Sequence, residues 1–423
     1  MGSIASNVTE LELADGARIF ISPTKAKDVV TVRGSVLGGW NMLPHGRGDI
    51  QTLAVELMDA GTSTKSKDQI REALSDRGIN LSFSAGGDRT YFSGSCLPEN
   101  LGFLLETVVE CLTGANFPAK EIALAKERAL GEWEESRTDT KLQASIALQR
   151  ELYNPTHFNY AYSIDERITQ TKSVTRTELL TFRKTLGRKG LILAIAGDVA
   201  LKNTERVVRM ALAKLPEGTA TVPVKKLNTK SPSNKETLIP IKDKANIDVF
   251  IGAATPFTID HPLYLAFALL MEMLGARGLS AGHLMRTIRE RDGLTYGIYA
   301  QLFGFSDGTD GAMRIWATFS PATYKKAVAA TRAEIAVFLK TLVTRDALLK
   351  IQDRISGSYI VSLSTTEGLA NMLHMIGRDG KALSYMDTYP DLVRSVTIED
   401  LVEVMKLVPF NSLSLAASGS FQK

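Results

Sequence analysis

The sequence predicts an α+β protein made of two similar repeated domains, each a mainly antiparallel sheet with helices packed on one face. The first observation is an internal repeat, in which one order of strands and helices recurs after about 215 to 225 residues. The second is length, because 423 residues are more than a single hydrophobic core usually organises. The third is composition, since 44% hydrophobic and 23% charged residues are typical of a globular protein.

Both halves begin with the same three elements. An apolar strand ending in glycine comes first, then an apolar helix, then a more polar helix, each closed by another glycine. The strands are Val29–Gly34 and Ile247–Gly252, the apolar helices Leu53–Gly61 and Leu265–Gly275, and the polar helices Gln69–Gly78 and Leu284–Gly293. Because the order is the same in both halves, we expect them to share one fold.

A strand pair and a long helix complete each half. Pro98 and Pro321 stand at matching places just before the two long helices, where a proline in the first turn is tolerated. In the second half, apolar residues of this helix recur at helical spacing: Val328, Ile335, Phe338, Leu339 and Leu342.

The first half closes with an apolar strand, Leu191–Ala196, and a helix, Glu205–Leu215. The segment Glu217–Glu236 follows, rich in Pro, Thr, Ser, Lys and Gly and without apolar periodicity, so it is predicted to be an exposed linker. The predicted division is a first domain at 1–216, a linker at 217–236 and a second domain at 237–423.

Charge and hydropathy exclude two classes of partner. Lys and Arg number 50 against 46 Asp and Glu, and they are mixed with acids, as in Lys65–Asp68, so no nucleic-acid surface is expected. No apolar stretch approaches the ~20 residues that span a bilayer, so no membrane span is expected. The printed N-terminus, Met1-Gly2-Ser3, runs into a polar segment without a signal-peptide pattern.

The two cysteines, Cys96 and Cys111, lie in apolar runs and are expected to be core thiols rather than a disulfide.

One segment of the second half resembles the second-domain pattern L-R-E-x-x-G-L-x-Y of the M16 peptidases, the pitrilysin and insulinase family. It runs from Leu284 to Tyr296. Weaker matches are Gly61-Thr62, Lys126-Glu127-Arg128 and Ala196-Gly197-Asp198-Val199. Their order and spacing carry the resemblance over nearly the whole chain, from Leu11 onward.

The resemblance implies a zinc motif, H-x-x-E-H, on the first apolar helix, where two imidazoles one turn apart bind the metal beside a catalytic glutamate. Here Thr52, Val55 and Glu56 stand at the three motif positions. Glu127 and Glu134 keep the spacing of the family's distal glutamates, but with Glu132 they are expected to form a solvated acidic face. The histidines are scattered, at 45, 157, 261, 283 and 374. The chain is therefore predicted to bind neither zinc nor another cofactor.

The family also carries an arginine and a tyrosine, seven residues apart in the domain without zinc, that reach across the cleft to the substrate. The resemblance assigns these catalytic roles to Arg289 and Tyr296. A guanidinium and a phenol are good donors to peptide carbonyls and to an oxyanion. Two structural alternatives remain open: Tyr296 alternates with Ile298 and Ala300 as a core-facing strand residue would, and Arg289 has carboxylates such as Glu290 and Asp292 close by in sequence.

Two further segments resemble parts of the family. Leu274–Gly282 is similar to a glycine-rich turn, and it lacks the spacing of a phosphate-binding loop. Asn80–Ala85 with Thr90–Ser95 resembles the sheet edge to which a peptide adds as a strand in a zinc-bearing domain.

The resemblance therefore implies a catalytically incomplete subunit of a heterodimeric zinc metallopeptidase, inactive alone. Its partner would be a homologous subunit that carries H-x-x-E-H and zinc, and the substrates would be unfolded peptides. The rival interpretation is a non-catalytic structural or binding subunit, like the core proteins of a respiratory complex that share this fold. A homodimer of the isolated chain is left open. The expected location is the periplasm, with the cytoplasm as the alternative.

Overall fold

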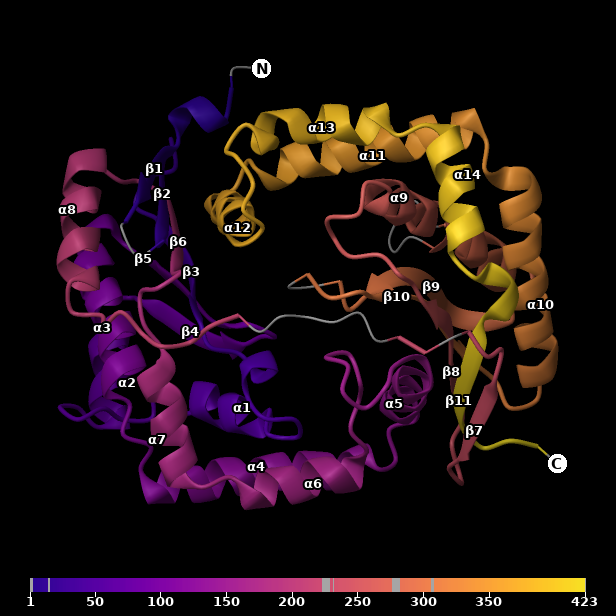
Figure 1. Cartoon of the computed structure of the whole chain (residues 1–423), viewed down its shortest axis with the longest axis horizontal. Helices are drawn as coiled ribbons and strands as arrows, with labels where there is room; N and C mark the ends of the chain where they lie inside the picture. Colours follow the sequence, from indigo (N-terminus) through magenta and orange to yellow (C-terminus); the bar gives the residue numbers. More distant parts are fainter. Residues whose placement is uncertain are drawn as a thin grey trace. The chain divides into compact units, whose positions relative to one another are not determined.

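The computed structural model describes residues 3–13, 16–222, 229–230, 232–275, 282–305 and 308–422. The chain forms two compact units, neither of which is continuous in sequence (Figure 1). Unit 1 comprises Met1–Gly131, Arg167–Val224 and Ser358–Tyr389. Unit 2 comprises Glu132–Glu166, Lys225–Gly357 and Pro390–Lys423. Among the described residues, no helix combines the length and the apolar character needed to cross a bilayer.

Unit 1 contains a six-stranded sheet in the order β1-β2-β6-β3-β5-β4. Only the β2–β6 pair is parallel, so the predicted mainly antiparallel sheet is confirmed. The central strand β6 is buried along its whole length, which explains its uninterrupted apolar sequence. The strands are β1 (Thr9–Glu12), β2 (Arg18–Pro23), β3 (Val30–Leu37), β4 (Asn80–Ala85), β5 (Arg89–Cys96) and β6 (Ile192–Gly197).

Helices cover one face of this sheet, as predicted, and one more helix covers part of the other. Side chains alternate along β2: Ile19 and Ile21 enter the main core with α1, α3, α7 and α8, whereas Phe20 packs with α12. Helix α12 contacts β6, β3 and β2 (Figure 1). The helices are α1 (Asp49–Glu56), α2 (Lys67–Ser75), α3 (Leu101–Gly114), α7 (Arg176–Thr185), α8 (Leu201–Leu212) and α12 (Thr366–Arg378), with short 3-10 turns at Ala5–Asn7, Trp40–Met42 and Pro98–Asn100.

The described residues of unit 2 repeat this strand order, with no counterpart of β1 among them. Its sheet runs β7-β11-β8-β10-β9, with β7 and β11 parallel, matching β2-β6-β3-β5-β4 strand for strand. The repeat predicted from the sequence is therefore a repeat of folded structure. The strands are β7 (Glu236–Pro240), β8 (Ile247–Ala254), β9 (Thr295–Phe303), β10 (Ala312–Phe319) and β11 (Ser414–Gly419).

Helix α5 packs against β7, β8 and β11 of this second sheet. The helices of unit 2 are α5 (Thr140–Leu152), α9 (Tyr264–Gly275), the π-helix η4 (Met285–Arg291), α10 (Tyr324–Val337), the π-helix η5 (Phe338–Leu342) and α14 (Ile398–Leu407), with a 3-10 turn at Phe410–Ser412. The helices that contain a unit boundary are α4 (Ala119–Ser136), α6 (Ile164–Ser173), α11 (Arg345–Ser362) and α13 (Tyr385–Ser395).

The units therefore do not coincide with contiguous halves of the sequence. The chain passes from unit 1 to unit 2 between Val224 and Lys225, inside the predicted linker, of which 223–228 and 231 lie outside the described residues. However, residues 132–166 pack in unit 2 and 358–389 in unit 1. The division at 1–216 and 237–423 stays a prediction that describes the sequence repeat. The period of a repeat does not indicate against which sheet a given helix packs.

Both cysteines are free and buried, in agreement with their prediction as core residues. Burial raises the pKa of the Cys96 thiol to about 11 and that of the Cys111 thiol to about 12. Neither thiol is therefore ionised at neutral pH.

Candidate functional site

The segment that carries Arg289 is the short π-helix η4 of unit 2. Leu284 and Ile288, one turn apart, are fully buried and fix the inner face of this helix, as the sequence indicated. Gly293 ends the helix with a φ of +63°, a conformation that glycine adopts without strain, and the chain then enters β9. Arg289 follows a buried residue directly and is left on the exposed side.

Arg289 has no carboxylate partner among the described residues. Within that part of the chain, its side chain contacts the Met285 sulfur, from Nη1 at 3.8 Å. Two nearby carboxylates are engaged elsewhere: Asp292 accepts two hydrogen bonds from Arg291, and Glu334 accepts another from the same guanidinium at 2.9 Å. The alternative in which Arg289 serves a local ion pair therefore finds no support in the described residues.

Tyr296 is 87% exposed, although it alternates with the buried Ile298. The reason is a break in the ladder between β9 and β10. Ala317 pairs with Ile298 but Phe319 pairs with Thr295, so β9 carries one residue more than β10 across this interval. Such a bulge re-aims side chains, and Tyr296, one of the two β9 residues within it, points to solvent. The core-facing alternative for Tyr296 is therefore wrong.

Glu334 of α10 holds η4 in place. Its two carboxylate oxygens contact His283 Nε2 at 2.7 Å and Arg291 Nη2 at 2.9 Å; His283 precedes the helix and Arg291 is its last residue. Burial lowers the pKa of His283, and the hydrogen bond to Glu334 offsets only part of this effect. His283 and Arg291 are thus both bound by Glu334 within unit 2, whereas Arg289 is not part of this network.

The residues at the zinc-motif positions of unit 1 do not fit a metal ion. Thr52 is exposed on α1, and Val55 is buried in the core. The carboxylate of Glu56 forms an ion pair with Arg128 of α4, the neighbour of Glu127. A guanidinium thus neutralises the one carboxylate at the three motif positions, and α1 offers no imidazole. Within the described ranges, no cluster of three or more His, Cys, Asp or Glu could hold a metal.

The acidic side chains of α4 are solvated, as the sequence indicated. Glu127 and Glu132 are exposed, and Glu134 bonds to Arg137 on the next turn. The glycine-rich segment Leu274–Gly282 lies largely outside the described residues, which omit 276–281.

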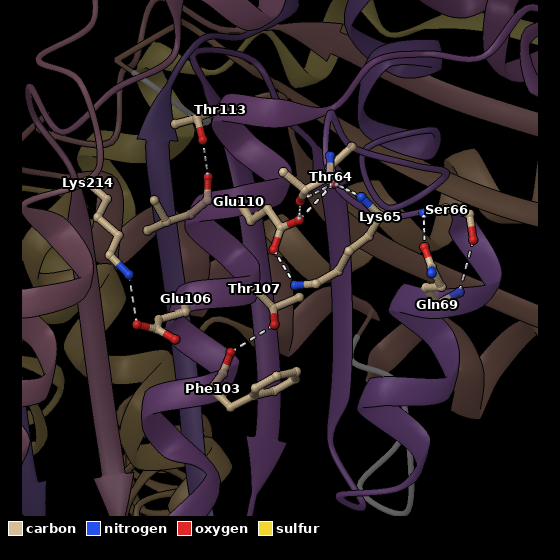
Figure 2. Close-up of polar contacts among 12 residues, drawn as sticks. Thr64, Lys65, Ser66, Gln69, Phe103, Glu106, Thr107, Glu110, Thr113 and Lys214 are labelled. Atoms are coloured by element: carbon tan, nitrogen blue, oxygen red, sulfur yellow. Dashed lines mark hydrogen bonds and ion pairs between the residues drawn. The ribbon is translucent and has the colours of Figure 1, made fainter.

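The loop after α1, which carries the Gly61-Thr62 match, is held by one carboxylate of α3. Glu110 accepts hydrogen bonds from the Thr62 and Thr64 hydroxyls at 2.8 and 2.7 Å and from Lys65 Nζ at 2.5 Å (Figure 2). Burial alone would raise the pKa of Glu110, but these bonds hold it below its ordinary value. The matched residues at this loop therefore have a structural role in this chain.

Comparison with protein families gives one match. Residues 173–355 match the family described as the inactive domain of peptidase M16. Among curated proteins, the non-peptidase homolog YmxG of Helicobacter pylori is 22% identical over 389 residues, which cover 91% of this chain and 88% of that protein.

Solved structures match over the whole chain. An M16 inactive-domain protein from Pseudomonas fluorescens has a TM-score of 0.88 at 21% identity and covers 99% of both chains. A protease from Helicobacter pylori follows with a TM-score of 0.82 at 16% identity, over 97% of this chain and 99% of that one. The periplasmic protease PqqL from Escherichia coli has a TM-score of 0.81 at 14% identity, and this chain spans 46% of its length. At these identities the structures establish a shared two-domain fold.

Proposed function

We infer from the match of residues 173–355 that this chain is an M16-type peptidase subunit of the inactive class. We propose that it completes the active site of a homologous partner that carries H-x-x-E-H and zinc. In this division of labour the chain supplies Arg289 and Tyr296, and the isolated chain cleaves no peptide.

The observation that carries the proposal is an exposed donor pair that the fold of unit 2 does not use. Tyr296 is turned to solvent by a bulge, and Arg289 meets only a methionine sulfur among the described residues. A large aromatic side chain that is 87% exposed gains little for its own fold, because most of its apolar surface stays in water. Exposed aromatic and arginine side chains are characteristic of residues that anchor a bound partner.

The chemistry of the pair suits peptide cleavage at a metal. The guanidinium presents several N–H donors in a rigid fork, and the phenol adds an O–H donor. Both could bind peptide carbonyls in the ground state and strengthen their hydrogen bonds as the scissile carbonyl becomes an oxyanion. The partner's zinc would supply the activated water and polarise the carbonyl.

The zinc-motif helix supports the assignment of the metal to a partner. At position 56, where the family's motif has a metal-binding histidine, this chain has a glutamate that forms an ion pair with Arg128. Unfolded peptides as substrates and the periplasm as the location are parts of the same proposal. Fractionation of cells that express the natural gene, with detection of this chain by antibody, tests the location.

The decisive experiment is kinetic and uses the mixed complex with the nearest homologue that carries H-x-x-E-H. We expect the isolated chain to be inactive on a fluorogenic peptide and the mixture to be active. Arg289→Ala and Tyr296→Phe should each lower kcat/KM, by as much as 10²- to 10³-fold where the lost donor acts on the oxyanion. Co-purification of the two chains and the zinc content of the partner should not change.

Arg286→Ala is the matched control, since Arg286 is an exposed arginine of the same π-helix. It should leave the kinetics of the mixture at the wild-type level. An active mixture whose kinetics are insensitive to both Arg289→Ala and Tyr296→Phe would instead favour the structural or binding subunit. Zinc-dependent cleavage by the isolated chain would refute the division of labour altogether.

A further inference from the structure

A polar hollow of about 420 Å³ lies in unit 1, on the face of β3, β5 and β4 opposite the main core and next to α12. Its floor consists of polar side chains at every second position of these strands, because alternate residues point to one face of a sheet. Two cross-strand rows line it: Asn80, Ser95 and Thr31 form one, and Ser82, Ser93 and Arg33 form the other.

Arg33 is the single cation of this lining. Its Nε donates to the side-chain oxygen of Asn371 on α12 at 2.6 Å, which fixes the plane of the guanidinium. Among the described residues no carboxylate pairs with Arg33, and no hydrogen-bond acceptor contacts its two terminal nitrogens. A half-buried guanidinium held by a neutral amide keeps its full charge and most of its donors for a ligand.

A buried histidine and an acidic residue lie near Arg33. His374 of α12 lies close by, with Nε2 at 2.8 Å from the Ser35 hydroxyl. Its pKa is lowered to about 3, first by burial and then by the charges of Arg89, Arg378 and Arg33. Because Arg378 pairs with Asp379, Arg33 is the cation that the hollow itself presents to an anion. Glu367 lines the hollow from the first turn of α12 and opposes a second negative charge on the ligand.

We propose that this hollow binds a monoanionic carboxylate. The terminal nitrogens of Arg33 would bind the two carboxylate oxygens in parallel, and the hydroxyls of Ser82 and Ser93 lie in the same row to bind a polar body behind it. The carboxylate could belong to the C-terminus of a peptide or to a small organic acid. The site involves neither Arg289 nor Tyr296 and is independent of the function proposed above.

The test is isothermal titration calorimetry of the full chain with three probes: N-acetyl-trialanine with a free carboxyl end, the same peptide with a C-terminal amide, and lactate. We expect the free-acid peptide to bind and its amide to bind at least tenfold more weakly. Lactate as strong as the free acid would identify small organic acids as the source, and weak or absent lactate binding would identify a peptide C-terminus. Equal binding of acid and amide, or no binding of either carboxylate, overturns the proposal.

Arg33→Gln is the informative variant, because the glutamine amide reaches the position of the arginine Nε and keeps the bond to Asn371 while the terminal nitrogens are lost. It should weaken binding of the carboxylate on the order of tenfold to hundredfold. Asn371→Asp, nearly isosteric, should have a similar effect by pairing Arg33 internally. Arg71→Gln, at an exposed arginine of α2, is the control and should not change binding. Unchanged affinity in both Arg33→Gln and Asn371→Asp, with folding intact by circular dichroism, refutes the site.

Discussion

Replacement of His374 tests how α12 is attached to the first sheet. This histidine is 6% exposed, contacts the Ser35 hydroxyl of β3, and has its ring 5.6 Å from that of Tyr91. Burial lowers its pKa from 6.5 to about 3, with a further contribution from neighbouring arginines. The folded protein therefore keeps the ring neutral at a pH where the unfolded chain protonates it.

The sign and size of the effect follow from proton linkage. Because the pKa is depressed in the folded state, the stability from His374 is fully present above pH 6.5 and is lost as the pH falls toward 3. Between pH 7 and pH 5, protonation of the unfolded chain alone removes about 2 kcal/mol of unfolding free energy. This figure hardly depends on the folded pKa as long as that value stays below about 4.

The assay is urea unfolding at pH 7 and pH 5, followed by circular dichroism. His374→Gln keeps a hydrogen-bonding group near Ser35 but cannot titrate. The stability lost by the variant between the two pH values should be smaller than the wild-type loss by about 2 kcal/mol. Ser35→Ala is the control: it should lower stability at both pH values by roughly 1 kcal/mol and retain the wild-type pH dependence. Equal pH dependence in wild type and His374→Gln would refute a neutral, buried His374.

Four further outcomes are expected. Gly377→Ala places a methyl group 2.6 Å from Ile192 Cγ2, at the contact of α12 with β6, and should cost about 1–3 kcal/mol in urea unfolding. By contrast Gly131→Ala meets nothing within 4 Å in α4 and should gain about 0.5–1 kcal/mol. A double-mutant cycle on Glu56 and Arg128 should give a coupling of at most about 1 kcal/mol, because both side chains are partly exposed. The two buried thiols should react with a thiol-specific dye only after unfolding, because their pKa values are far above neutral.

Local patterns in the sequence were sufficient for the repetition and for the strands and helices that the two halves share. Apolar strands followed by amphipathic helices define the two sheets, and the glycine at 293 marks the end of the helix that bears Arg289. The substitutions at 52, 55 and 56 are likewise visible without a structure, because a metal ligand is a matter of residue type. The prediction of buried, unpaired cysteines follows from their apolar neighbours and is confirmed.

The exposure of Tyr296 results from a β-bulge, which the alternation of residues along the sequence does not reveal. A two-residue period placed Tyr296 on the same face as Ile298, but the bulge opposite Ala317 and Phe319 shifts that face by one residue. A bulge is fixed by pairing with another strand, so it leaves no periodic signal in β9 itself. The partners of Arg289 could not be inferred either, because Glu334, which binds Arg291, is distant in sequence.

By itself the sequence indicated that one pattern of strands and helices occurs twice and that the zinc ligands are missing, although the helix expected at Leu53–Gly61 forms at Asp49–Glu56. Each of these is set by neighbouring residues or by residue identity. Only the tertiary structure decided that α5 packs in unit 2 and α12 in unit 1. It also decided that Arg128 forms an ion pair with Glu56 and that Arg33 lines a polar hollow. These are contacts between segments far apart in the chain, and the free energy that selects them comes from packing and charge pairing, which hydrophobic periodicity does not record.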